Sequence, residues 1–199
     1  MSGCETDFVA KNSEFQDLAM GIARTALERM PDSLEDLLKL PFGEGTVNDA
    51  VTQQTGKSGE KHAIPFYNKL EAPFVASYIH MNNKVATIVG FTKPISAEAG
   101  KEIAMQITAM VPVAVNRDSC PQDIIDKEMH IYREQIRMEG KPEEMVEKIA
   151  MGKLNKFFKE YTLEDQTFVK DGKISVKEYL KTIDPEVKVT GFHRFSLND

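Results

Sequence analysis

The sequence is poor in the residues that build covalent or metal-bound frameworks. Only two cysteines occur in 199 residues, Cys4 and Cys120, and they lie too far apart to form a ligand pair. The four histidines are scattered singly, none at ligand spacing from another: His62, His80, His130 and His193. We therefore exclude a disulfide framework and a zinc module, expect no metal site, and expect a reducing, cytoplasmic environment.

Long apolar runs and an excess of basic residues are also absent. No segment approaches the roughly 20 apolar residues of a membrane-spanning helix, and the first residues contain no apolar signal core, so we expect no membrane partner. Lys and Arg total 25 against 31 Asp and Glu, a formal net charge of −6. Because neutralising phosphates needs a basic surface, this balance argues against direct nucleic-acid binding.

Motifs typical of catalysis are present only in part. Gly56-Lys57-Ser58 resembles the end of a phosphate-binding loop, but Val51 stands where that loop needs a glycine. Residues 171–178 copy the second half of a calcium-binding loop, yet Val169 occupies a position that needs an oxygen ligand. A turn followed by a capped helix is expected there instead. We expect no covalent chemistry and no cofactor.

Apolar periodicity predicts helices in the first part of the chain. Over residues 12–30, apolar side chains recur at steps of three and four, and Asn12 or Ser13 can cap the first turn. Two shorter helices are expected, one after Ser33 and one after Thr46.

The pattern then changes to that of strands. Residues 63–70 and 74–80 alternate as strands, and 84–92 form a β-branched run that pairs back as a hairpin across a turn at 81–83. Residues 187–197 alternate as a final strand.

Two further helical segments complete the pattern. Ser96 caps a helix that Pro112 ends. The segment 121–161 has dense mixed charge and a narrow apolar seam on each side of a short break at Gly140, which predicts an antiparallel helical hairpin of the coiled-coil kind. The predicted fold class is α+β, with antiparallel sheets, packed helices and this protruding hairpin.

The predicted domain organisation has three parts. Residues 1–93 form an N-terminal α+β subdomain of the core. Residues 94–120 and 162–199 form a C-terminal α+β subdomain, into which the helical hairpin, residues 121–161, is inserted.

One apolar pair near the start has two interpretations. Phe8 and Val9 follow Asp7 and belong to no helical stripe. Since large apolar residues are usually interior, spacing alone favours a loop that folds back into the body. The alternative is an exposed wedge, in which one aromatic ring supplies most of a contact's energy.

Residues 4–12, with the sequence CETDFVAKN, closely resemble the signature of the elongation factor Ts family. Members of this family are nucleotide-exchange factors for the translational GTPase elongation factor Tu. Five further blocks resemble the family in the same order: residues 77–80, 103–109, 147–154, 166–169 and 189–195. The resemblance covers nearly the whole chain.

The resemblance implies a function, a partner and a set of contact residues. It implies an exchange factor of translation elongation, which is not an enzyme in the covalent sense, with elongation factor Tu as its partner. Asp7 and Phe8 are expected to press against the nucleotide-binding domain of the GTPase, which the helix around residue 105 also approaches. The implied partner-binding residues are Thr6, Asp7, Phe8, Val9, Met105 and Gln106. Family members often carry histidine where this chain has Gln106.

Two departures and one rival function accompany the resemblance. The family normally begins with a small helical domain and an apolar strand that leads into the first block; we expect both to be missing here and exchange to be weakened. The rival is a non-catalytic interaction or oligomerisation module that uses the helical arm, residues 121–161. A homodimer is left open.

Overall fold

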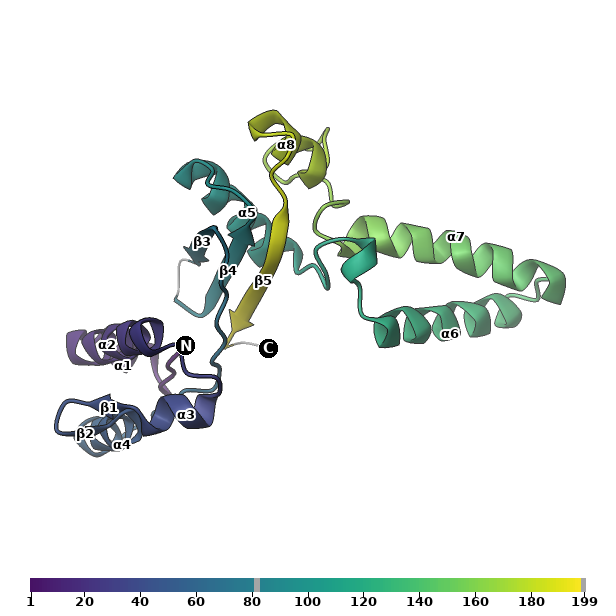
Figure 1. Cartoon of the computed structure of the whole chain (residues 1–199). Helices are drawn as coiled ribbons and strands as arrows, with labels where there is room; N and C mark the ends of the chain where they lie inside the picture. Colours follow the sequence, from purple (N-terminus) through teal and green to yellow (C-terminus); the bar gives the residue numbers. More distant parts are fainter. Residues whose placement is uncertain (81–82, 198–199) are drawn as a thin grey trace. The chain divides into compact units, whose positions relative to one another are not determined.

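Helices and antiparallel strands are mixed along the chain in the computed structural model, which describes residues 1–80 and 83–197 (Figure 1). The predicted α+β class is confirmed. The described residues form two compact units, one of residues 1–69 and one from Leu70 onward. The predicted three-part division of the chain stays a prediction. The predicted turn at 81–83 falls mostly outside the described residues.

The first unit is mainly helical. Its elements are α1 (Asp7–Ala10), α2 (Ser13–Arg29), α3 (Leu34–Lys39), β1 (Pro41–Phe42), β2 (Gly45–Thr46) and α4 (Val47–Ser58). The Asn12 side chain caps α2 by accepting from the Glu14 N–H, and Thr46 with Asp49 forms a capping box on α4. The core of the unit consists of Ile22, Leu37, Val47 and Ile64. The predicted helices of this region are confirmed.

The predicted strand over residues 63–70 is wrong. This segment, which the structure describes in full, makes one isolated antiparallel bridge, between Ala63 and Gly3. Its apolar alternation has another cause, because Ile64 is buried in the core of the first unit while Pro65 is exposed. Proline also lacks the N–H that a sheet ladder needs.

The second unit contains a three-stranded antiparallel sheet in the order β3 (Phe74–Ile79), β4 (Val85–Phe91), β5 (Val189–Ser196). Helix α5 (Ala97–Met110) packs on one face through the buried Ile103 and Ile107. The close approach requires a glycine, because a Cβ on Gly100 would lie 2.7 Å from the Cβ of Ala76. The helix-on-sheet core therefore fixes the position of α5.

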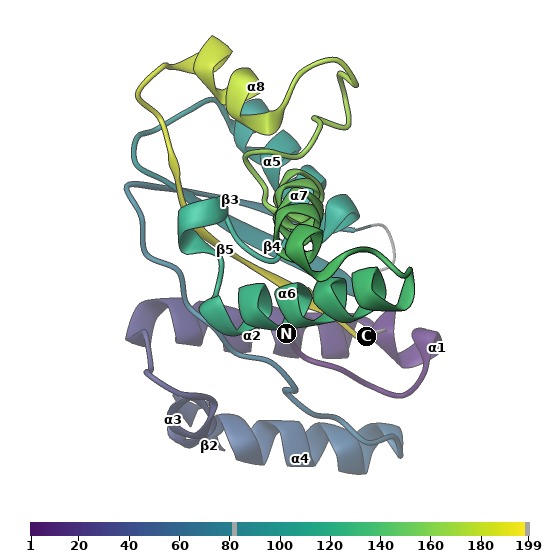
Figure 2. The ribbon, with the colours of Figure 1, turned by 90° about the vertical axis from the view of Figure 1, so that its right-hand side faces the viewer.

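Helices α6 (Gln122–Met138) and α7 (Glu143–Tyr161) form the predicted hairpin and lie side by side (Figures 1 and 2). Gly140 turns the chain between them with φ +73°. At the base, the Val113 N–H donates to the Tyr161 carbonyl (2.9 Å) and the Leu163 N–H to the Ala114 carbonyl (3.0 Å). These bonds join the hairpin to the rest of its unit, from which Figure 1 shows it extending.

A short capped helix precedes the last strand. Helix α8 (Val176–Ile183) begins with a capping box of Ser175 and Glu178, so the turn and capped helix expected in place of a calcium loop are confirmed. Across residues 1–80 and 83–197, every helix is too short or too polar to cross a bilayer.

Candidate partner-binding site

The first candidate region is the one-turn helix α1, which presents Phe8 to solvent. The Phe8 side chain is 86% exposed, Thr6 and Asp7 are exposed, and Val9 is half-buried. The Thr6 hydroxyl caps the turn by accepting from the Val9 N–H (3.3 Å). The interpretation that this segment folds back into the body is therefore wrong, and the ring has the exposure that a wedge requires.

Hydrogen bonds to residues outside α1 hold both of its ends. Glu60 accepts from the Thr6 N–H (3.0 Å) and from the Thr6 hydroxyl (2.6 Å). At the other end, the Gln16 side-chain amide donates to the Ala10 carbonyl (3.2 Å). Glu60 could not be predicted as part of this region, because a hydrogen bond across 54 residues leaves no periodic signal in a sequence.

The nearby thiol is not an activated nucleophile. Burial, followed by the negative charge of Glu60, raises the pKa of Cys4 above its ordinary value. A thiol with a raised pKa stays protonated at neutral pH and is a poor nucleophile. Chemistry on this sulfur is therefore not what the α1 region offers.

The second candidate region lies on α5, where two adjacent residues differ sharply. Met105 is 36% exposed, whereas Gln106 is 2% exposed. The Gln106 amide donates to the Gln166 side-chain carbonyl (3.1 Å) and to the Thr167 carbonyl (3.1 Å). Its own oxygen accepts from the Val169 N–H (2.8 Å). Gln106 therefore fixes the loop of residues 166–169 against α5.

This loop adds an apolar side chain that the predicted site did not include. Val169 is 58% exposed, although its backbone N–H is bound to the buried amide of Gln106. The preceding Phe168 is 3% exposed and stacks on Tyr179 with ring centroids 4.1 Å apart. The second region thus exposes Met105 and Val169 on a rigid base. Thr6 to Val9 belong to the first unit, and Met105 and Gln106 to the second.

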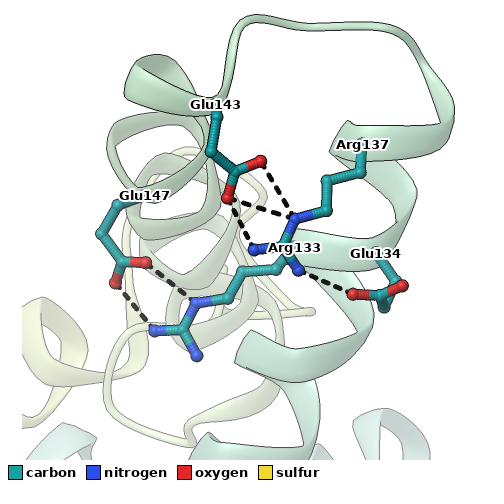
Figure 3. A network of polar contacts seen from close by, with 5 residues as sticks. All are labelled: Arg133, Glu134, Arg137, Glu143 and Glu147. Atoms are coloured by element: carbon teal, nitrogen blue, oxygen red, sulfur yellow. Dashed lines mark hydrogen bonds and ion pairs between the residues drawn. The ribbon is translucent and has the colours of Figure 1, made fainter.

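The hairpin has a polar outer surface that links its two helices (Figure 3). Arg133 binds Glu147 through two bonds of 2.8 Å, and Arg137 bridges Glu134 and Glu143 at 2.7 Å each. Hydrogen bonds from the arginines hold the pKa values of Glu143 and Glu147 below their ordinary range. Such forked pairs fix the register of one helix against the other.

The remaining polar side chains do not converge on a site for chemistry. Among the residues that the structure describes, no group of three or more His, Cys, Asp or Glu is placed to hold a metal ion. The hollow beside α8, about 330 Å³, is lined by charges of both signs, among them Arg117, Glu164 and Lys181. The exposed apolar residues on anchored segments are therefore the best candidates for a partner-binding surface.

Comparisons with known proteins agree with this result. The family model described as "Elongation factor TS" matches residues 5–199. An elongation factor Ts of Christiangramia forsetii is 47% identical over 196 residues, which cover 98% of this chain and 71% of the relative. Those of Porphyromonas gingivalis and Flavobacterium psychrophilum are 45% and 44% identical, again over 98% of this chain and over 72% and 71% of their own lengths.

The matched region contains both candidate surfaces and the helical hairpin. At this identity and coverage the comparison concerns the whole described fold and not one motif. The chain belongs to the elongation factor Ts family, the cytoplasmic nucleotide-exchange factors that serve elongation factor Tu in translation elongation.

Proposed function

We propose that Phe8, presented by α1, enters between helices of elongation factor Tu that support its magnesium ion. The observation that carries this proposal is the 86% exposure of a large aromatic ring on a turn held at both ends. An exposed phenylalanine in water gains free energy when a partner covers it, and a single aromatic anchor supplies on the order of 2 kcal/mol or more. Asp7 and Val9 flank the ring in the same contact.

The wedge would act on affinity and not on bonds. A translational GTPase holds GDP through a phosphate loop and a magnesium ion, and magnesium needs near-ideal octahedral geometry. A small displacement of the supporting helices therefore weakens GDP binding. By thermodynamic linkage, GDP weakens binding of the exchange factor by the same ratio. The chain thus accelerates release without making or breaking a covalent bond.

We propose that α5 makes the second contact, through Met105. The resemblance also places Gln106 among the contact residues. Its side-chain amide is already bonded to residues 166–169, so we propose that Gln106 supports the contact of Met105 indirectly. Val169, whose N–H is bound to Gln106, adds a second exposed apolar side chain to this region.

Further parts of the proposal concern regions outside these two surfaces. The relatives named above are longer than the matched region, which covers 71–72% of each. We propose that their remaining length includes the small helical domain expected from the resemblance, and that it strengthens docking.

We also retain the proposed division into residues 1–93, 94–120 with 162–199, and 121–161. Self-association through the arm is tested by light scattering.

The decisive experiment is stopped-flow release of fluorescent GDP from elongation factor Tu with Phe8→Ala. A loss of about 2 kcal/mol of contact energy corresponds to roughly 30-fold slower release. The matched control is Leu27→Ala, since Leu27 is also apolar and 73% exposed in the first unit. Release as fast with Phe8→Ala as with the parent chain contradicts the wedge. If deletion of residues 121–161 then abolishes function, the chain is an interaction module.

A further inference from the structure

We infer that Glu60 is a positioning residue for nucleotide exchange: through Thr6 it holds α1 in the conformation that presents Phe8. This inference rests on the proposed function of Phe8. Glu60 lies 54 residues from Thr6 in sequence and just after the end of α4. Nothing in the resemblance to the family assigns it a role.

Helix α1 is not stable by itself. It has four residues, all at least partly exposed, and apolar packing therefore contributes little to its stability. An isolated turn of this length is unstable in water, because nucleation fixes several backbone angles for very few hydrogen bonds. Its conformation must come from anchors outside it.

Glu60 binds Thr6, the residue whose hydroxyl caps the turn. Both carboxylate oxygens accept from Thr6, one from its N–H and one from its hydroxyl. The same hydroxyl oxygen accepts from the Val9 N–H and so closes the first turn. A hydroxyl that donates to a carboxylate is oriented to accept from the helix, so the carboxylate aligns the cap. Hydrogen bonds from Thr6 also keep the pKa of Glu60 below its ordinary value, so the group is ionised at neutral pH.

A partly buried hydrogen-bond network holds the backbone of Glu60 in turn. Its backbone N–H donates to the Ser58 hydroxyl oxygen (3.1 Å), which also contacts Nε2 of His62 (2.8 Å). His62 is 7% exposed, and its ring lies against Phe15 of α2 with centroids 5.2 Å apart. The backbone of Glu60 is therefore tied to the end of α4 and, through Ser58, to the buried His62.

For nucleotide exchange, Glu60 matters through the fraction of molecules in which α1 has the presenting conformation. If α1 adopts the presenting conformation only part of the time, the apparent affinity for the GTPase falls by that fraction. Once bound, the partner itself orders the turn, so the release rate at saturation is retained. Loss of Glu60 therefore raises the half-saturating concentration of the exchange factor, by about 3- to 10-fold, and leaves the maximal rate nearly unchanged.

The test is the concentration dependence of fluorescent GDP release from elongation factor Tu with Glu60→Ala, alone and combined with Phe8→Ala. We expect the 3- to 10-fold rise with Phe8 present and no further change when Phe8 is absent. Glu60→Gln keeps an acceptor for Thr6 and is expected to recover most of the loss. The neighbouring Lys61→Ala, also at an exposed position, is the matched control. An equal loss in both backgrounds, or no loss in either, overturns the inference.

A second measurement is independent of exchange and so separates this inference from the proposed function. Amide hydrogen exchange of Val9, Ala10 and Asn12, which donate within or next to α1, is expected to be faster in free Glu60→Ala while α4 keeps its protection. Unchanged protection at these amides means that α1 forms without Glu60, which overturns the inference. If Phe8→Ala leaves GDP release unchanged, the proposed function fails, and the amide measurement alone decides the role of Glu60.

Discussion

Helix α1 and the α6–α7 hairpin place their large apolar side chains in opposite ways. The hairpin buries a seam that includes Ile136 and Ala150, both 0% exposed, and carries its ion pairs outside. Helix α1 exposes Phe8 and is held by polar bonds from Glu60 and Gln16. A segment that stabilises itself by burial has little apolar surface left for a partner. A segment that offers an aromatic ring must be stabilised from elsewhere.

The largest effect that tests this contrast is on stability, in the seam of the hairpin. Ile136→Ala removes a fully buried side chain and leaves a cavity between the helices. Such truncations cost about 2–5 kcal/mol, so we expect a loss near 4 kcal/mol in the free energy of unfolding. Denaturant unfolding followed by circular dichroism measures it. Met138→Ala is the control, since Met138 is 86% exposed on the same helix; a similar loss there would show that the seam is not what stabilises the hairpin.

The next effect concerns the buried amide on α5. Gln106→Leu leaves the Thr167 carbonyl and the Val169 N–H without their partner. An unsatisfied buried group costs about 1–3 kcal/mol, so the expected loss is roughly 2 kcal/mol. Hydrogen exchange at the Val169 amide reports the freed loop. Gln106→His can still donate and accept and is expected to lose less; equal losses would mean that volume matters here and not hydrogen bonding.

A smaller effect is the pH dependence of the hairpin. The pKa values of Glu143 and Glu147 are lowered in the folded state by hydrogen bonds from Arg137 and Arg133, from an ordinary value of 4.5. Their contribution is therefore present above about pH 4.5 and is lost as the pH falls through the folded-state values. We expect the melting temperature to fall between pH 6 and pH 3, and less so in Glu143→Gln combined with Glu147→Gln. Equal falls in both chains contradict a role for these pairs.

The smallest expected effect is that of Phe8→Ala on stability. A ring that is 86% exposed contributes little to folding, so the change should lie within about 0.5 kcal/mol. The same denaturant titration used for Ile136→Ala measures it. A loss above 1 kcal/mol would mean that Phe8 packs on its own chain, which would remove the contrast between the two regions.

The hairpin and the capped helices could be predicted from the sequence because their signals are local. Steps of three and four around Gly140, and side-chain caps such as Ser175, depend on residues a few positions apart. The resemblance implied the proposed contact residues Thr6 to Val9 for the same reason, since they lie in one short contiguous block. The exposure of Phe8 could not be predicted, because a single turn is too short to show an apolar repeat. Phenylalanine side chains are also usually buried.

The other errors and omissions involve partners distant in sequence. Residues 63–70 alternate like a strand, yet no neighbouring strand is placed to pair with them in the described structure. The bonds between Thr6 and Glu60 and those between Gln106 and residues 166–169 join segments that only the tertiary fold brings together. A single sequence carries no signal for such contacts, which is why Gln106 was expected at a surface and lies beneath one.

The strand order β3-β4-β5 also has a consequence for folding during translation. During synthesis, β4 leaves the ribosome with one edge unpaired. The α6–α7 hairpin then folds from local contacts while the chain continues to grow. Its other neighbour, Val189–Ser196, is translated roughly 100 residues later. At about 5–20 residues per second, β4 waits roughly 5–20 seconds for it. A protein that serves translation thus carries an open sheet edge for several seconds of its own translation.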